Sequence, residues 1–205
     1  IQMEVYNLKS KKTLILFFAL AMVATACSSA AVPCDEVEIT TGENGLPDLD
    51  GCEFTFAVEN AYLPFNYIDA ETGEAMGWDY DVFNYMGELM NFTPVYVPTA
   101  WDGMIQATAD GQFMIAGDGI TITAERDEIV DFSDGYINLA QRVLVAVGNT
   151  EITSIEDLKS GDYIVATQKG TTNYDFAVNA LGEDKVKAFD DFNFAIQAVI
   201  SGDAD

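Results

Sequence analysis

Arg126 is the residue whose chemistry stands out first, because the chain of 205 residues has only one other arginine, Arg142. A guanidinium can hold the planar carboxylate of a small ligand through two parallel hydrogen bonds. The alternative for Arg126 is a surface ion pair with Glu125 or Asp127, which would contribute little. Arg126 is therefore the strongest candidate in the sequence for binding a carboxylate.

Histidine is absent from the sequence, which removes several kinds of catalytic and metal site. No Ser-His or Cys-His nucleophile pair can form, and no His ligand is available for zinc or iron. The sequence also lacks an Asp-x-Asp-x-Asp-Gly calcium loop. A metal site built from carboxylates alone is the alternative that stays open, but we expect no catalytic residue, no metal site and no cofactor.

Acidic residues dominate the charge of the chain. It holds 34 Asp and Glu against 9 Lys and Arg, which gives a formal net charge of -25. Such a surface repels nucleic acid and anionic membrane surfaces, so we expect neither as a partner. Hydrophobic residues make up 49% of the chain, which is typical of a globular protein and not of a disordered one.

The N-terminal segment has the layout of an export signal. Three lysines precede an apolar run over 13–26, which is shorter than the roughly 20 residues of a membrane-spanning helix. The small residues before Cys27 resemble a bacterial lipobox, in which the cysteine is acylated. We predict a signal peptide over 1–26 and lipidation at Cys27; an ordinary cleaved signal or an uncleaved anchor is the alternative.

Two further cysteines, Cys34 and Cys52, lie in a polar segment over 27–52 that we interpret as a tether. In an oxidising compartment they can pair and close a short loop, with a stabilisation of about 3 kcal/mol. Two free thiols are the alternative, because the sequence does not give their geometry.

Strand and helix patterns alternate through the rest of the chain. Strand-like segments lie at 53–59, 93–97, 113–116, 129–132, 163–167 and 186–189. Helix-like segments lie at 101–112, 124–128, 171–181 and 192–201. Two further helices are expected to begin at N-cap residues. One begins at Asp79, and the other begins at Ser154, where Asp157 would complete a capping box. This alternation predicts an α/β fold with largely parallel sheets. The pattern restarts after an apolar, β-branched stretch at 137–148, so we divide the folded part into a first lobe, 53–143, and a second lobe, 144–205.

Four segments together resemble one protein family. They are YLPF at 62–65, GWDYD at 77–81, GITITAER at 119–126 with VDFS at 130–133, and QKGTT at 168–172. In this order and spacing they resemble the extracytoplasmic solute-binding proteins of family 3, which bind polar amino acids for ABC transporters. The resemblance runs from about Glu53 to Asp205.

The resemblance implies the type II periplasmic-binding-protein-like fold, in which hinge strands join two α/β lobes and the ligand lies in a cleft. The first hinge strand would lie within 137–148. Relatives continue beyond Asp205, where they supply a carboxylate for the ligand's α-ammonium. We therefore expect a C-terminally truncated chain with an incomplete second lobe, which alone binds amino acids poorly.

The resemblance also assigns residues to the amino-acid end of the ligand. Arg126 would grip the carboxylate, Thr121 would offer its hydroxyl and amide, and Gly119 would offer backbone groups. Thr172 would add its amide at the positive N-terminus of a second-lobe helix. Alternatively, Thr172 is an ordinary cap or first-turn residue of that helix.

A second set of residues would surround the ligand's side chain. Tyr62 and Trp101 would supply aromatic faces, unless Trp101 is a core residue. Glu59 would touch the far end of the ligand, and Gln168 is a weaker candidate. Asp118 departs from the small neutral residue of relatives, and would either meet the ligand's ammonium or cap the following turn. The two acids favour a ligand with a basic or amide side chain.

The predicted function is that of a substrate-binding lipoprotein, which captures a polar amino acid outside the membrane and delivers it to an ABC permease. We expect a monomer that contacts the membrane only through its N-terminal lipid, in the periplasm or on the outer face of the cell membrane. Two alternatives use the same fold, namely an enzyme similar to the cyclohexadienyl dehydratases and the ligand-binding module of a sensor protein.

Overall fold

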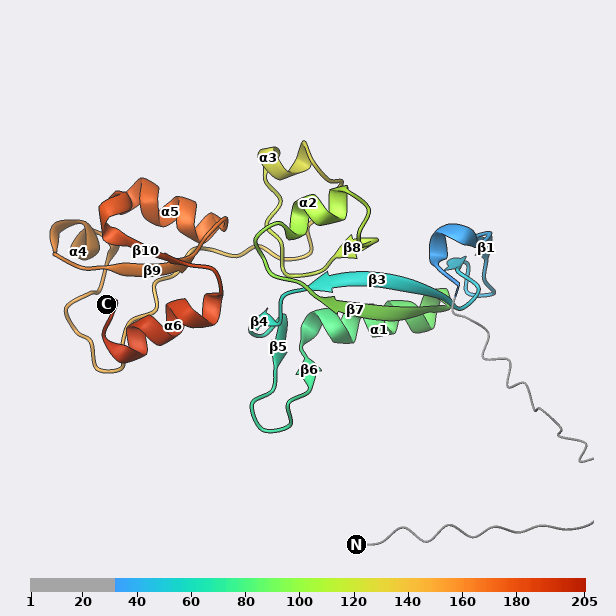
Figure 1. The fold of residues 1–205 in the computed structure, drawn as a ribbon, viewed down its shortest axis with the longest axis horizontal. Coiled ribbons are helices and arrows are strands. Elements are labelled where there is room, and N and C mark those ends of the chain that lie inside the picture. Colours follow the sequence, from blue (N-terminus) through green and yellow to red (C-terminus); the bar gives the residue numbers. More distant parts are fainter. Residues whose placement is uncertain (1–31) are drawn as a thin grey trace, which may run out of the picture. The chain divides into compact units, whose positions relative to one another are not determined.

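The computed structural model describes residues 32–205 (Figure 1). The predicted signal peptide and the predicted lipidation site, Cys27, lie outside the described residues. Within residues 32–205, no helix is both long enough and apolar enough to cross a membrane.

Three parallel strands form the first sheet, in the order β7-β3-β8. They are β3 (Cys52–Val58), β7 (Phe92–Pro98) and β8 (Ile115–Ala116). Parallel strands need long crossover connections, and these contain α1 (Trp78–Met90) and α2 (Met104–Ala109) (Figure 1). Phe56 of β3 is buried and stacks on Phe83 of α1, with 4.2 Å between ring centroids. The core of the first lobe therefore lies between this sheet and α1.

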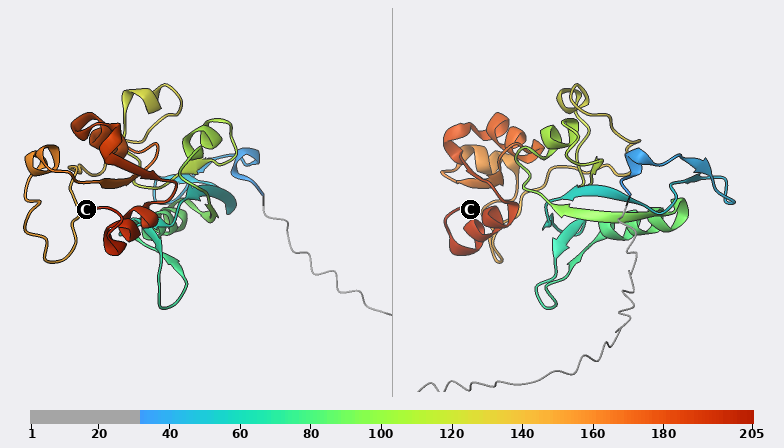
Figure 2. Two further views of the ribbon diagram at one scale, coloured as in Figure 1. Left: turned by 60° about the vertical axis from the view of Figure 1, so that its left-hand side comes forward. Right: turned by 45° about the vertical axis from the view of Figure 1, so that its right-hand side comes forward.

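A small antiparallel sheet follows β3. Its strands are β4 (Ala61–Tyr62), β5 (Asn66–Ile68) and β6 (Ala75–Met76). The loop between β5 and β6 projects away from the first sheet in both views of Figure 2. Tyr62 of β4 is paired with Asn66 of β5, so the small sheet places an aromatic residue beside a polar one.

The segment before β3 is joined to it covalently. It contains η1 (Cys34–Glu36), β1 (Thr40–Thr41) and β2 (Pro47–Asp48). Cys34 forms a disulfide with Cys52, the first residue of β3. Both cysteines and Leu49 are buried in the same core as the first sheet. Part of the segment interpreted as a tether thus packs against the first lobe.

Two parallel strands, β9 (Val165–Gln168) and β10 (Val186–Phe189), form the second sheet. The neighbouring helices are α4 (Ile155–Ser160), α5 (Thr172–Leu181), η2 (Glu183–Lys185) and α6 (Phe192–Ser201). Both α5 and α6 pack on this strand pair (Figure 1). The α4 helix begins with a complete capping box, in which the Ser154 hydroxyl accepts from the Asp157 N–H and the Asp157 carboxylate accepts from the Ser154 N–H.

Two helix starts differ from the prediction. Gly77, and not Asp79, is the N-cap residue of α1. Gly77 has φ 131°, and a side chain there would collide with the Phe65 carbonyl group, so only glycine fits. Asp79 lies inside the helix, where its side chain is buried. The helix predicted over 101–112 begins only after Gly103, which has φ 85°.

Two predicted strands do not form in the part of the chain that the structure describes. Segments 129–132 and 137–148 contain no strand, and apolar side chains such as Leu139 and Leu144 are exposed. A strand needs backbone partners on a neighbouring strand, and residues 32–205 provide none at these positions. The prediction of a hinge strand within 137–148 is therefore wrong for the described structure.

Candidate ligand-binding site

Arg126 lies on the short helix α3 (Ala124–Asp127) and links two loops that are distant in sequence. Its half-buried guanidinium donates from Nη1 to the Thr121 carbonyl oxygen at 2.9 Å and from Nη2 to the Gly170 carbonyl oxygen at 3.2 Å. Burial lowers the pKa of Arg126 and nearby carboxylates oppose that shift, but a guanidinium stays protonated in proteins. The structure therefore holds a fixed cation between the loop before α3 and the loop before α5.

Trp101 lies against this cation. The Arg126 Cζ atom is 5.1 Å from the centroid of the indole ring, within cation–π range. The indole Nε1 donates to the same Gly170 carbonyl oxygen at 3.1 Å. The backbone N–H of Trp101 favours the charged form of the Glu59 carboxylate. Trp101 is not among the buried core residues, and it contacts both a cation and an acid, as a site residue would.

Thr171, and not Thr172, caps α5. The Thr171 Oγ1 accepts from the Tyr174 backbone N–H at 3.1 Å, whereas the Thr172 Oγ1 accepts from the Gln141 side chain at 3.5 Å. The Thr172 hydroxyl therefore takes no part in capping. Sequence reasoning missed Thr171, although two adjacent threonines at a helix start offer either one as the cap.

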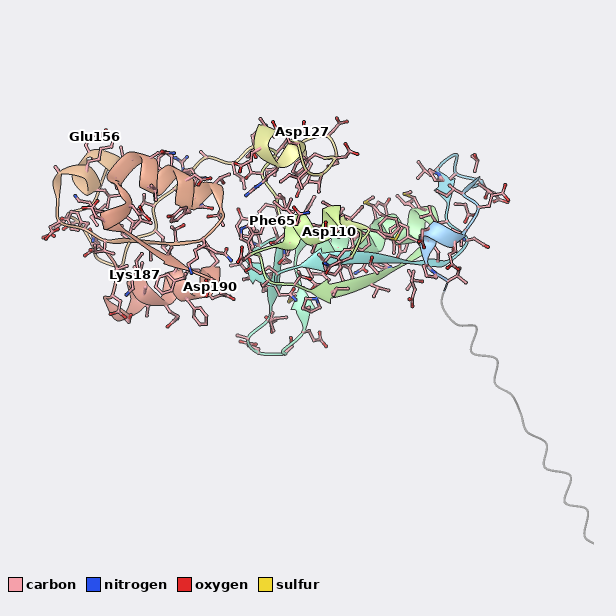
Figure 3. All side chains as sticks on the ribbon, turned by 45° about the horizontal axis from the view of Figure 1, so that its top comes forward. Phe65, Asp110, Asp127, Glu156, Lys187 and Asp190 are labelled. Atoms are coloured by element: carbon pink, nitrogen blue, oxygen red, sulfur yellow. A yellow bond between two sulfur atoms is a disulfide. The ribbon has the colours of Figure 1, made fainter. Side chains whose placement is uncertain are left out.

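Gln168, at the end of β9, reaches an acid that follows β3. Its Nε2 donates to Glu59 Oε1 at 2.6 Å and to the Asp190 carbonyl oxygen at 3.1 Å. Burial raises the pKa of Glu59, and the hydrogen bond from Gln168 opposes the shift. The Asp190 carboxylate, labelled in Figure 3, forms an exposed ion pair with Lys169 at 2.7 Å. The structure thus brings Gln168 and Glu59 together, as two candidates for one site.

Asn66 joins two buried carboxylates of the first lobe. Its Nδ2 donates to Asp79 Oδ2 at 2.8 Å and to Asp118 Oδ1 at 2.5 Å. Burial raises the pKa of Asp79, and it raises the pKa of Asp118 to about 7, where the charge on Glu59 contributes in the same direction. Sequence reasoning missed Asn66 and the buried role of Asp79, since no local pattern marks a short-strand asparagine as the partner of residues so far away.

Tyr62 lies between the loop that carries Asp118 and helix α6. Its ring centroid is 5.0 Å from that of Phe65 and 6.2 Å from that of Phe192. Sequence reasoning did not identify Phe192 as a neighbour of the site. Gly119 has φ 55°, and an added Cβ atom would lie 2.9 Å from the Tyr62 ring. The glycine therefore lets the loop approach the ring closely. Burial raises the pKa of Tyr62, and the charge on Asp118 adds to this effect.

The predicted residues thus fall into two groups that Trp101 connects. One group holds the Arg126 cation with Thr121, and the other holds Glu59, Gln168 and Asp118, with Tyr62 and Gly119 at its side. Such an arrangement can bind a carboxylate at one end and a cation or an amide at the other. Within residues 32–205, no cluster of three His, Cys, Asp or Glu side chains is arranged to hold a metal ion.

An apolar cavity lies apart from these residues. It has a volume of about 430 Å³, lies among residues 141–205 and is lined mainly by apolar side chains such as Leu158, Ala177 and Ile196. Arg126 and Glu59 do not line it. We therefore place the candidate site at the polar groups described above and not in this apolar cavity.

Comparisons with known proteins agree on one family. Residues 54–202 match the profile of the bacterial extracellular solute-binding proteins, family 3. A probable histidine-binding protein of Neisseria gonorrhoeae is 32% identical over 158 residues, which cover 76% of this chain and 58% of that protein. The structure of the ancestral amino acid-binding protein AncCDT-1, a precursor of cyclohexadienyl dehydratase, is 38% identical with a TM-score of 0.70. An ancestral arginine-binding protein bound to glutamine is 34% identical with a TM-score of 0.69. Each of these two alignments covers 75% of this chain and 67% of the other.

Proposed function

Because the chain belongs to the bacterial extracellular solute-binding proteins of family 3, we propose that it captures a free polar amino acid with a basic or amide side chain and delivers it to an ABC permease. The family and the type II periplasmic-binding-protein-like fold predicted from the sequence are both confirmed. The chain spans about 58% of the length of its histidine-binding relative, so the function of the whole protein is part of this proposal.

The placement of Arg126 is the observation that carries the proposal. Its two guanidinium donors point at the carbonyl oxygens of Thr121 and Gly170. A ligand carboxylate that takes over these donors would also meet the positive N-terminus of α5, which starts at Thr172. Binding would then connect a first-lobe loop to a second-lobe helix and so favour closure of the lobes.

The side-chain end of the ligand would meet the residue group that contains Glu59, Gln168 and Asp118. Glu59 and Asp118 would accept hydrogen bonds from a basic or amide side chain, and the Gln168 amide would add a donor or an acceptor. The rings of Tyr62 and Trp101 would cover the aliphatic part of the ligand. Together these residues would select a polar amino acid by its charge and by its length.

Export and anchoring complete the proposal. We assign residues 1–26 to a signal peptide and Cys27 to lipid attachment, on the sequence pattern alone. The protein would act as a monomer outside the cytoplasm, with lobes over 53–143 and 144–205. The membrane contact would be the N-terminal lipid, and the protein partner would be the transmembrane subunits of the permease.

A thermal-shift panel of the twenty amino acids, on the protein produced from its complete gene, tests this function. A true ligand at 100 times its Kd should stabilise the folded protein by about 2.7 kcal/mol. Arg126→Lys should remove the effect because lysine cannot form the paired hydrogen bonds, whereas Arg142→Lys, which changes the other arginine, should keep it. The proposal fails if no amino acid raises the Tm, or if both variants respond like the parent.

A second candidate function rests on Asp118. A buried carboxyl with a pKa of about 7 can act as a general acid or base at neutral pH, and AncCDT-1 is described as a precursor of cyclohexadienyl dehydratase. Incubation with prephenate or arogenate separates the two functions. A new aromatic product, absent with Asp118→Asn, would favour the enzyme, whereas unchanged substrate would favour transport.

A further inference from the structure

A buried hydrogen-bonded cluster includes Asp118 of the candidate site. Asn66, Asp79 and Asp118 have exposed fractions of 0%, 1% and 3%. The Asn66 amide nitrogen donates to both carboxylates, and its Oδ1 accepts from the Asn60 backbone N–H at 2.7 Å. Because each polar atom of the amide has a partner, Asn66 holds the Asp118 carboxyl in one orientation.

These acids have no cation of their own. From residue 32 to residue 141 the only lysine or arginine in the sequence is Arg126, and its guanidinium donates to two carbonyl oxygens. The one ion pair among residues 32–205 joins Lys169 and Asp190. Glu59 and Asp118 therefore have hydrogen-bond partners but no ion-pair partner among these residues. Buried carboxylates without a cation are unfavourable, so such a group either binds a proton or attracts an external cation.

The acidic groups that interact electrostatically with Asp118 come from several elements. They are the carboxyls of Glu59 and Asp79 and the hydroxyls of Tyr62, Tyr80 and Tyr136, whose ionisation Asp118 opposes. All of these groups are acids. Burial and this surrounding raise the pKa of Asp118 to about 7, although the Asn66 amide and the Glu59 backbone N–H oppose the shift. Near neutral pH, therefore, the free carboxyl is populated in both its protonated and its charged form.

We propose that Asp118, with Asn66 as its positioning residue, distinguishes a cationic ligand side chain from a neutral one by exchanging its proton for the ligand's charge. A guanidinium or ammonium group binds the carboxylate form, and the displaced proton passes to the solvent. A neutral amide or urea group binds the protonated form, whose O–H donates to the ligand's carbonyl oxygen. The inference rests on the proposed function, because it requires an amino acid in this site.

Calorimetry with arginine and citrulline tests the inference, because the two ligands share their α-groups and differ in side-chain charge. With a pKa of about 7 for free Asp118, arginine affinity should rise by about tenfold from pH 6 to pH 8, while citrulline affinity should not rise. Titrations in buffers of different ionisation enthalpy should detect about one proton released per arginine at pH 6 and about none at pH 8. This proton count needs no variant.

Three variants separate the role of Asp118 from general effects of charge. Asp118→Asn should lower arginine affinity at pH 8 by at least about tenfold, abolish its pH dependence and leave citrulline binding intact. Asp81→Asn removes the same charge from an exposed position of α1 and should keep the parent profile. Asn66→Asp replaces the shared donor by a further acid, so the midpoint of arginine binding should move to higher pH, which a purely structural role would not produce.

The outcomes distinguish this inference from the proposed function. If no amino acid binds at any pH, the proposed function fails and takes the inference with it. If arginine binds with the same affinity at pH 6 and pH 8 and releases no proton, only the inference is overturned. Preferential binding of an acidic amino acid, or an Asp118→Asn profile equal to that of the parent, would overturn it as well.

Discussion

Replacing Asp118 by asparagine should stabilise the ligand-free protein, by an amount that grows with pH. The Asp118 carboxyl has its pKa raised from 3.8 to about 7 by burial in the folded state. Between these two pH values the folded protein binds more protons than the unfolded chain, so the free energy of unfolding falls as pH rises. The Asp118→Asn variant cannot ionise at this position and escapes that loss.

The size of the effect follows from the pKa difference. Each pH unit of difference corresponds to about 1.4 kcal/mol, so the shift from 3.8 to about 7 amounts to about 4 kcal/mol. The advantage of Asp118→Asn should increase between pH 4 and pH 7 and level off above pH 7. In a protein of this size, it corresponds to a rise in Tm of roughly 10 °C at pH 8.

Urea unfolding of the parent and the variant, followed by tryptophan fluorescence from pH 5 to pH 8 without ligand, measures this difference. Asp81→Asn is the matched control, because Asp81 is exposed on α1, and its stability difference from the parent should stay nearly constant with pH. The reasoning is refuted if Asp118→Asn is less stable than the parent at pH 8, or if the difference between them is equal at pH 5 and pH 8.

Three further predictions concern backbone and covalent features. Gly119→Ala should lower the free energy of unfolding by at least about 2 kcal/mol, because position 119 has a positive φ and lies against the Tyr62 ring. The control Gly45→Ala has φ 81° and no atom near the added Cβ, so it should lower the free energy of unfolding by about 1 kcal/mol. Equal losses in urea unfolding would contradict this prediction. Replacing Cys34 and Cys52 together by serine should cost about 3 kcal/mol in the same assay without changing amino-acid affinity, and unaltered stability would disprove it. Ser154→Ala should remove the α4 cap and cost about 1 kcal/mol in urea unfolding; a stability equal to that of the parent would show that the cap is dispensable.

Local sequence signals were sufficient for several elements of the second lobe. The predicted strand at 186–189 and the predicted helix at 192–201 match β10 and α6 residue for residue. The capping box at Ser154 also forms as expected. These features succeed because periodicity and capping depend on residues within a few positions of each other. The family and fold class were likewise accessible, since four short motifs in a fixed order carry them.

Predictions failed where a residue's state depends on distant partners. The stretch at 137–148 is rich in β-branched residues, yet no strand forms there among residues 32–205, because a strand needs neighbours that propensity cannot supply. Asp79 has the right residue type for an N-cap, yet Gly77 is the N-cap of α1, and Asp79 accepts a hydrogen bond from Asn66 inside the fold.

The candidate site was likewise predictable from the sequence only in part. Its chemical groups were predictable from residue type: one arginine for a carboxylate, acids for a polar side chain, and aromatic residues around them. Their partners were not, because Asn66 reaches Asp118 across 52 positions and Gln168 reaches Glu59 across 109. A chain reveals which groups it carries, but burial and long-range contacts decide their ionisation and orientation, and only the folded arrangement sets these for Asp118 and Asn66.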